Sequence, residues 1–260
     1  MTDPLEERPE KTQSIVLCEG YHDRAFWAGW LLSRLGCTDP GDPSGKSARE
    51  KVMDPWERLV VGGDFGFRSA SGHFIRVTPC HGKQNILPIA EGHLKRRRSW
   101  PLTALVLAAD SDLEAGVDGQ TTGPNPQAIL NLLQSVGRAD TTEIGWIAGD
   151  TPVWLVRWAA QDSPSQNIPS RETLERLVCA ALVAAYPDRG PAVRQWLASP
   201  ARPAETGPKN HLWSHMAGWF AEHGCDDFFR RLWDNQSVAA QLEQRLRATG
   251  AWGIAETLTR

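Results

Sequence analysis

The sequence lacks long hydrophobic runs, and neither sign of charge is in strong excess. No stretch approaches the ~20 apolar residues that a membrane-spanning helix requires, and residues 1–13 are polar, without the apolar region of a signal peptide. We therefore expect a cytoplasmic protein with no membrane association. The formal net charge of -3 excludes a basic coat over the whole surface, so any contact with nucleic acid must be local.

Paired cysteines are also missing. The five cysteines are scattered without a C-x-x-C pair, which excludes a zinc ribbon and a disulfide framework and favours a reducing compartment. A nucleotide-binding P-loop is missing as well, because Gly41 and Gly45 enclose three residues where the Walker pattern needs four. Any ATPase activity associated with this protein must therefore come from a separate chain.

The composition is that of an ordinary globular protein, with 41% hydrophobic and 23% charged residues. Apolar patterning up to residue 158 predicts alternating strands and helices, which is typical of a doubly wound α/β layer. The predicted strands are residues 14–18, 58–61, 73–77, 102–109, 144–147 and 153–158, and the predicted helices are residues 23–35, 85–94 and 126–136. Residues 102–109 are the most apolar run, as expected for a central strand buried on both faces.

Strand patterns end after residue 171. Helical spacing predicts helices over residues 173–186, 192–197, 211–222, 226–233 and 238–248. The proline-bearing segment 163–169 is the natural boundary. We therefore predict an α/β domain over residues 11–162 and an all-helical C-terminal domain over residues 163–260.

Carboxylates follow two of the predicted strands. Glu19 follows the first strand, and Asp110 and Asp112 follow the most apolar one. Ligands of open α/β sheets bind at the carboxyl ends of the strands, so these three side chains share one edge if the strands are neighbours. If the chain stays extended beyond residue 110, Asp110 and Asp112 also point the same way. Hard oxygen ligands of this kind suit Mg²⁺ or Mn²⁺, whereas the alternative is ordinary turn-capping aspartates.

Two strings resemble the motifs of the TOPRIM family. Val16-Leu17-Cys18-Glu19-Gly20 is similar to the first motif, an apolar strand ending in Glu-Gly, and residues 105–112 are similar to the second, an apolar strand ending in D-x-D. The all-helical tail and a Lys-x-His-x-Trp string at residues 209–213 are similar to stand-alone relatives of the overcoming-lysogenization-defect nucleases. The resemblance covers roughly residues 11–158 and implies a TOPRIM-like, mainly parallel sheet with flanking helices.

The resemblance also implies functions for particular residues. Glu19 is expected to bind metal or handle a proton, and Asp110 and Asp112 are expected to bind Mg²⁺ or Mn²⁺. Asp23 lies where related enzymes place an acidic residue, although it also fits a helix N-cap. Glu114 and Asp118 are candidates for a second metal site, with solvated loop charges as the alternative.

Basic side chains supply candidates for phosphate contact. A late lysine near the metals stabilises transition-state charge in related nucleases, which indicates Lys209, or alternatively Lys83. The dense run Lys95, Arg96, Arg97 and Arg98 is either a nucleic-acid contact or a solvated helix end. We expect Lys83 and this run to bind nucleic acid.

The function implied is metal-dependent cleavage of phosphodiester bonds in DNA. The alternatives are an RNA nuclease, acting for example on tRNA, and a TOPRIM effector subunit that works with a separate ATPase in defence against phage. A homo-oligomer is also compatible with the sequence. The twelve tryptophans fall mostly at helical spacing among apolar residues, which favours core packing over base stacking.

Overall fold

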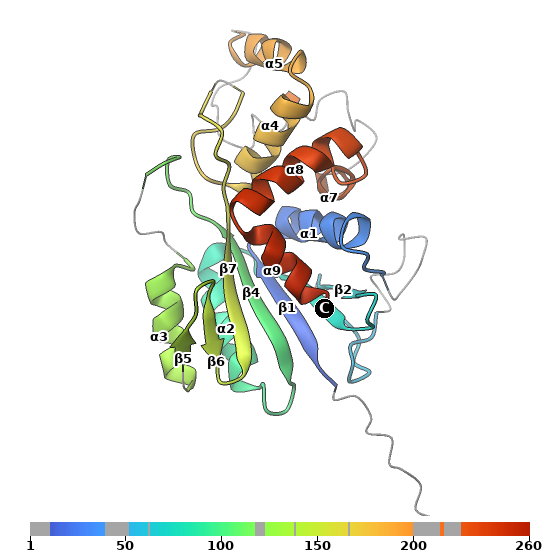
Figure 1. The fold of residues 1–260 in the computed structure, drawn as a ribbon, viewed down its shortest axis with the longest axis vertical. Coiled ribbons are helices and arrows are strands. Elements are labelled where there is room, and N and C mark those ends of the chain that lie inside the picture. Colours follow the sequence, from blue (N-terminus) through green and yellow to red (C-terminus); the bar gives the residue numbers. More distant parts are fainter. Residues whose placement is uncertain are drawn as a thin grey trace, which may run out of the picture.

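A seven-stranded sheet forms the centre of the computed structural model, which describes residues 11–39, 52–61, 63–117, 123–137, 139–165, 167–199, 214–215 and 225–260 (Figure 1). The strand order is β2-β3-β1-β4-β7-β6-β5. The strands are β1 (Gln13–Cys18), β2 (Phe65–Arg68), β3 (Phe74–Pro79), β4 (Leu102–Asp110), β5 (Ala139–Thr141), β6 (Trp146–Ala148) and β7 (Thr151–Trp158).

The four central strands, β3-β1-β4-β7, are parallel. The outer strands β2, β6 and β5 pair antiparallel with their neighbours, so the sheet is mixed. The predicted α/β class is therefore confirmed. The first strand, β1, and the most apolar strand, β4, are neighbours, which is the condition under which Glu19 and Asp110 share one edge.

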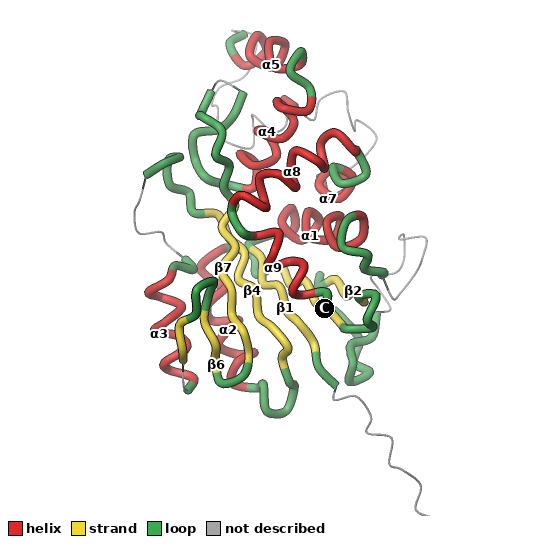
Figure 2. The backbone as a smooth tube through the Cα atoms, in the orientation of Figure 1, coloured by secondary structure: helices red, strands yellow, loops and turns green. Residues whose placement is uncertain are grey.

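Helices cover both faces of the sheet (Figure 2). Helices α1, α4 and α9 contact strands on one face, whereas α2 and α3 contact strands on the other. The α-helices are α1 (Tyr21–Ser33), α2 (Ile86–Lys95), α3 (Pro126–Val136), α4 (Leu174–Ala185), α5 (Arg189–Leu197), α7 (Cys225–Arg231), α8 (Gln236–Ala248) and α9 (Ala251–Leu258). A short 3-10 helix, η2 (Lys83–Asn85), precedes α2.

The central strand β4 explains why both faces are covered. Val106 and Ala108 face the cluster formed with α1, α4, α7, α8 and α9, whereas Leu105 and Leu107 face the cluster formed with α2 and α3. All four side chains are fully inaccessible to solvent. An uninterrupted apolar run is therefore required here, since alternate residues enter opposite cores.

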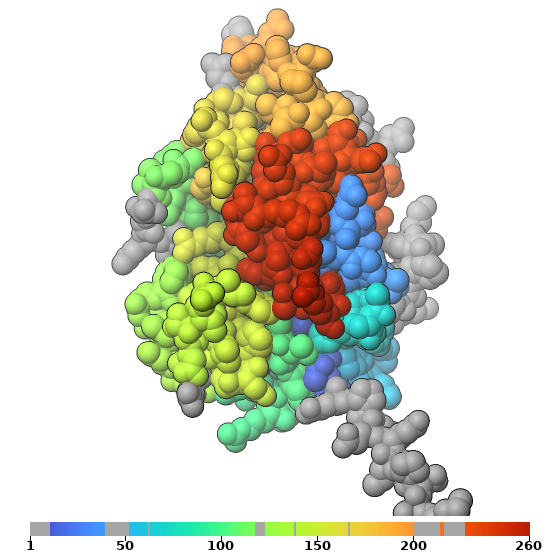
Figure 3. Space-filling model, in the orientation of Figure 1, coloured from blue at the N-terminus to red at the C-terminus, as the bar shows by residue number. Residues whose placement is uncertain are grey.

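The C-terminal helices share a hydrophobic core with the sheet. Helix α7 packs against α1, α8 packs against α4, and α9 contacts β7, so the C-terminal segment lies across one face of the sheet (Figure 3). The division into domains 11–162 and 163–260 stays a prediction. No helix in the described ranges is long and apolar enough to cross a membrane.

Buried tryptophans support this shared core. Trp30 stacks on Trp27 at 4.9 Å and on Trp233 at 5.5 Å between ring centroids, and all three are buried. The indole nitrogen of Trp233 donates to the carbonyl of Phe26 at 3.0 Å. These rings pack in the core rather than forming an exposed surface for base stacking.

The elements differ from the sequence prediction at four places. Residues 58–61 form no strand, because the chain folds back to make the isolated bridge between Met53 and Leu59, and the real edge strand is β2. Strand β5 was not expected. The strand predicted at residues 144–147 is β6, which begins two residues later and ends one residue later. Helix α9 follows Gly250, beyond the last predicted helix. Most of the helix predicted at residues 211–222, and the stretch around Gly41 and Gly45, lie outside the described residues.

Candidate functional site

The carboxyl ends of the parallel strands bring the acidic residues to one edge of the sheet. Cys18 pairs with Ala108 in β4, and Asp110 pairs with Trp158 in β7. Glu19, which leaves β1, and Asp110, which ends β4, are therefore at the same edge, which in Figure 1 lies toward α4. This is the edge at which open α/β sheets bind ligands.

Glu19 lies in the turn between β1 and α1. Its backbone carbonyl accepts a hydrogen bond from the amide of Gly82 at 2.9 Å, which ties this turn to the one after β3. The carboxylate atom Oε2 is buried and has no hydrogen-bond partner among the described residues. Burial raises the pKa of Glu19, and the charge of Asp112 raises it further, whereas Lys83 lowers it. An unpartnered buried carboxylate oxygen is costly unless a proton or a cation satisfies it.

Asp23 lies one turn into α1 and is held by two hydrogen bonds. Its Oδ2 accepts from the amide of Gly20 at 3.2 Å. Gly20 is the N-cap of α1 and Asp23 the third residue of the helix, so the expectation that Asp23 is the N-cap is wrong, although its side chain does bond to the N-cap amide. Its Oδ1 accepts from the indole nitrogen of Trp158 at 2.7 Å. Burial raises the pKa of Asp23, against the effect of the bond from Trp158 and with a further rise from the charges of Glu19 and Glu175; the resulting pKa is about 7.

Asp110 faces the beginning of α4. Its Oδ1 accepts a hydrogen bond of 2.8 Å from the amide of Leu174, the first residue of the helix. Burial and the charges of Asp23, Glu175 and Glu19 raise the pKa of Asp110 well above its ordinary value, against the effect of this backbone bond. The helix N-terminus partly compensates a negative charge that its neighbours repel.

Asp112 does not point the same way as Asp110. The chain turns after β4, where the amides of Ser111 and Asp112 both donate to the carbonyl of Glu172 at 3.2 Å. Asp112 has a positive φ of 55°, a left-handed conformation that breaks the extended path. The expectation of two parallel side chains is therefore wrong, and Asp112 instead forms an ion pair with Lys83, at the start of η2.

Glu175 is an acidic residue of this cluster that the sequence did not indicate. It is 7% exposed, lies in the first turn of α4, and its charge raises the pKa of Glu19, Asp23 and Asp110. The only local signal is Thr173 followed by an acidic first turn, the ordinary pattern of a helix start. Nothing in that pattern distinguishes Glu175 from a residue that merely stabilises the helix.

The other predicted metal ligands are not brought into this cluster. Glu114 is exposed and lies 3.6 Å from Arg171, measured from Oε1 to Nε, in the loop after Asp112. Its charge is not among the causes that shift the pKa of Glu19 or Asp110. Asp118 and Lys209 lie outside the described residues. Of the two predicted lysines, the structure therefore places Lys83 at the carboxylates.

The basic run lies at the opposite edge of the sheet. Helix α2 runs from η2, at the carboxylate edge, back toward the start of β4, and ten residues of helix span about 15 Å. Lys95 pairs with Glu91 at 2.7 Å, and Arg97 donates to the carbonyl of Leu94 at 2.7 Å. The run therefore does not adjoin the carboxylates, and its contact with nucleic acid stays a prediction.

A pocket of about 270 Å³ adjoins the turn that carries Asp112. Residues from the ends of β4 and β7 and from the loops that follow line it: Ser111, Leu113, Glu114, Gly116, Val117, Arg157, Trp158, Ala159 and Glu172. Ser111 and Trp158 connect this pocket to the carboxylates, since they neighbour Asp110 in the chain and in the sheet. The pocket provides space for part of a ligand beside the acidic edge.

The cluster suits a hard divalent cation. Within the described ranges, no three His, Cys, Asp or Glu side chains are already arranged to hold a metal. Asp110, Asp23 and Asp112 are engaged by Leu174, Trp158 and Lys83. The donor set is nevertheless all oxygen, and Oε2 of Glu19 has no partner among these residues, which is the donor chemistry that Mg²⁺ and Mn²⁺ prefer. The donor types therefore match such a cation in chemistry, whereas the described side chains as placed do not form a metal-binding arrangement.

Comparisons with known proteins identify a fold rather than a family. The fold defines a protein of the α/β class with a mixed, centrally parallel sheet. The chain is similar to the crystal structure of a hypothetical protein from Pyrococcus horikoshii OT3, with a TM-score of 0.68 and 13% sequence identity over 96% of this chain and 100% of the other. No protein-family model matches the chain. No curated protein matches it either.

Proposed function

We propose that this protein is a divalent-metal-dependent nuclease that cleaves phosphodiester bonds in DNA. One observation carries the proposal: three carboxylates, Glu19, Asp110 and Glu175, come together at the carboxyl edge of the parallel strands, and Glu19 has an unpartnered buried oxygen. Mutual repulsion of this kind has no evident structural benefit. A cluster that is unfavourable when empty is typical of a site that binds a cation.

A bound Mg²⁺ or Mn²⁺ would act as a Lewis acid on the phosphate and lower the pKa of a water nucleophile. Glu19, Asp110 and Glu175 are the residues that would hold it, with Asp112 as a further ligand once Lys83 is released. Asp23, whose pKa is near 7, can accept or release a proton at neutral pH. Trp158 fixes the position of that carboxyl group.

Lys83 is the residue proposed to contact the scissile phosphate. Its side chain is 17% exposed and bonds to Asp112, which is 42% exposed, so the ammonium group lies at the border between the cluster and solvent. With Asp112 bound to a cation, the ammonium group of Lys83 would be available to contact a phosphate oxygen. Positive charge at that point stabilises negative charge that develops in phosphoryl transfer.

The TOPRIM resemblance supports this assignment of functions. The Glu-Gly turn after β1 and the D-x-D at the end of β4 are on neighbouring parallel strands, so the two strings that carry the resemblance lie side by side. The likeness to the Pyrococcus horikoshii protein concerns the fold alone. The choice of DNA, and the proposed relation to overcoming-lysogenization-defect nucleases, rest on the sequence motifs.

The substrate is tested by incubating the purified protein with plasmid, linear DNA and total RNA, each with Mg²⁺, with Mn²⁺ and with a chelator. We expect metal-dependent cleavage of at least one DNA form and none with the chelator. Cleavage of RNA alone would replace DNA as the substrate. If no substrate is cleaved in the presence of either metal, the proposal that this chain is a nuclease on its own is contradicted. The alternative, an effector subunit that works with a separate ATPase, would then be tested by adding that ATPase.

A further inference from the structure

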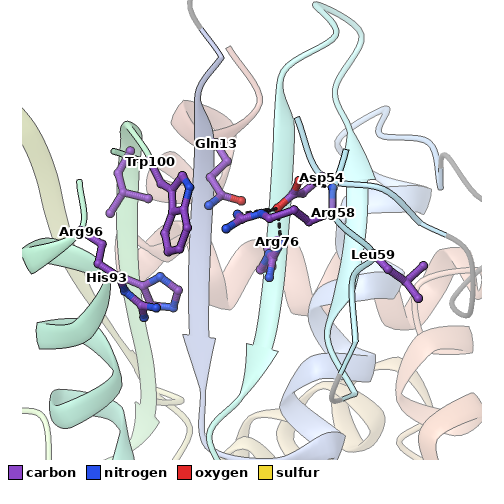
Figure 4. Close-up of a pocket in the computed structure, with 9 residues that line it drawn as sticks. Gln13, Asp54, Arg58, Leu59, Arg76, His93, Arg96 and Trp100 are labelled. Atoms are coloured by element: carbon purple, nitrogen blue, oxygen red, sulfur yellow. Dashed lines mark hydrogen bonds and ion pairs between the residues drawn. The ribbon is translucent and has the colours of Figure 1, made fainter. Parts of the chain in front are cut away.

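A second polar pocket lies at the other edge of the sheet, where the parallel strands begin (Figure 4). Gln13 opens β1 and pairs with Leu102 at the start of β4, and both residues line the pocket. The strand β4 has nine residues, so at about 3.3 Å per residue this pocket lies more than 20 Å from the carboxylates. The two sites are therefore separate.

Three arginines line this pocket, with a single carboxylate among its lining residues. Arg58, Arg76 and Arg96 contribute positive charge, whereas Asp54 contributes negative charge. Asp64 pairs with Arg76 at 3.3 Å but is not part of the lining. A pocket of about 300 Å³ with this charge favours an anionic ligand of small-molecule size.

The arginines are held in place before any ligand binds. The buried carboxylate of Asp54 bonds to Arg58 at 2.6 Å and to Arg76 at 3.0 Å. The guanidinium groups of Arg58 and Arg96 lie over the ring of Trp100, at 4.1 and 5.2 Å from its centroid. Carboxylate bonds and cation-π contacts of this kind fix the orientation of the planar guanidinium groups, which lowers the entropic cost of binding an anion.

The pKa of His93 reflects the positive charge around the pocket. Burial, together with the charges of Arg96, Arg76 and Arg58, lowers this pKa to about 4. The ring is therefore neutral at pH 7 and adds hydrogen-bonding capacity without charge. Its position on α2, one turn before Arg96, brings both side chains to the same wall of the pocket (Figure 4).

Two buried polar atoms among the lining residues have no partner in the described part of the chain. Gln13 is 3% exposed, and its Oε1 accepts no hydrogen bond. The Nε of Arg76 donates none. Figure 4 shows the side chain of Gln13, on β1, directed toward Arg58 and Arg76. Buried polar atoms usually have hydrogen-bond partners. A ligand with a donor for Oε1 of Gln13 and an acceptor for Nε of Arg76 would supply the missing ones.

We propose that this pocket binds a small phosphorylated molecule that also carries hydroxyl or amino groups, such as a sugar phosphate or a mononucleotide. The phosphate contacts Arg96 and Arg58, whose planar donors match phosphate oxygens. A hydroxyl or amino group of the ligand donates to Gln13. This proposal does not depend on the nuclease function, because it uses none of the residues at the carboxylate edge.

Isothermal titration calorimetry tests the proposal on the full chain in a chelating buffer, so that metals cannot recruit phosphate to the carboxylates. The probes are inorganic phosphate, ribose 5-phosphate and adenosine 5′-monophosphate. We expect saturable binding of at least one organic phosphate, at least tenfold tighter than inorganic phosphate. Equal affinity for all three would overturn the ligand class, and no saturable binding would overturn the site.

Variants identify the residues. Arg96→Gln should weaken binding about tenfold or more, because a charge-assisted bond to phosphate is lost. Gln13→Glu, which adds a negative charge beside Arg58 and Arg76, should abolish it. Arg98→Gln is the matched control, since Arg98 belongs to the same basic run but does not line the pocket. An equal effect of Arg98→Gln and Arg96→Gln, or no effect of Arg96→Gln, would contradict the proposal; circular dichroism checks that each variant folds.

Discussion

Lys83 and Asp112 form an ion pair that joins the turn after β3 to the turn after β4. The pair lies at the border of a cluster in which Glu19 and Asp110 have raised pKa values. Because the charge of Lys83 lowers the pKa of Glu19, this lysine stabilises the cluster when no cation is bound. We infer that Lys83 pairs with Asp112 when the site holds no cation, and that it would contact the substrate phosphate when a cation is bound.

Replacing Lys83 should therefore impair cleavage. Lys83→Gln removes the charge but keeps most of the chain length, and we expect a loss on the order of 10²-fold in the cleavage rate, as for a donor that stabilises transition-state charge. Lys11→Gln is the control, because Lys11 is exposed and precedes β1, at the edge of the sheet opposite to the carboxylates. Rates are compared at saturating Mn²⁺. Equal loss in both variants would point to general electrostatic attraction of the substrate.

Metal binding should stabilise the fold. A cation at a hundred times its dissociation constant adds about 2.7 kcal/mol, which for a chain of this size raises the melting temperature by on the order of 5 °C. The double substitution Asp110→Asn and Asp112→Asn should abolish that rise. It should spare the apo fold, because an asparagine oxygen can still accept the bond from Leu174. A rise of the same size in the double variant would place the metal elsewhere.

Glu175 should contribute to metal affinity, although it is distant in sequence from both motifs. Glu175→Gln removes one charge from the cluster, so we expect the dissociation constant for Mn²⁺ to increase about tenfold or more. Glu114→Gln is the matched control, since Glu114 faces Arg171 in the loop after Asp112. Calorimetric titration with Mn²⁺ measures both. If Glu114→Gln weakens binding more than Glu175→Gln, the assignment of the metal ligands is wrong.

Acid should destabilise the protein through His93. The pKa of His93 is about 4 in the folded chain, because of burial and the neighbouring arginines, and its ordinary value is 6.5. A lowered pKa means that the unfolded chain takes up the proton first as the pH falls. The contribution of neutral, buried His93 to the free energy of unfolding is therefore fully present above pH 6.5 and is lost progressively as the pH falls from 6.5 to 4. Urea unfolding across that range should show a steeper decline for the wild type than for His93→Gln; parallel declines would contradict this explanation.

Much of the fold could be predicted from apolar patterning. β1, β4 and β7 and helices α1 to α4 are long enough for their periodicity to be clear, and each was expected to within a few residues. Strand β5 was missed because two of its three residues, Asp140 and Thr141, are polar and exposed, so no apolar alternation marks it. Residues 58–61 have a strand-like composition, but Asp54 accepts the amides of Trp56 and Arg58 and turns the chain back on itself.

The site was only partly predictable for a related reason. The position of Glu19 and Asp110 follows from strand order, which a sheet of parallel strands restricts strongly. The partners of those carboxylates depend on contacts that join distant parts of the chain. Lys83 reaches Asp112 from the turn after β3, and Glu175 arrives with α4, beyond the segment covered by the motifs. No local spacing encodes either contact.

The central claim is that the cluster around Glu19 cleaves phosphodiester bonds with a divalent cation. Glu19→Gln tests it most directly, because the change keeps the size of the side chain and removes the charge that its unpartnered oxygen carries. Its raised pKa means that ionised Glu19 opposes folding, so the variant should melt at the same temperature as the wild type or higher in chelator. On a substrate that the wild type cleaves with Mn²⁺ or Mg²⁺, we expect at least a hundredfold slower cleavage, as an order-of-magnitude loss from removing an acid-base or metal-binding carboxylate. Equal cleavage by the wild type and Glu19→Gln would show that the cluster is not the catalytic site.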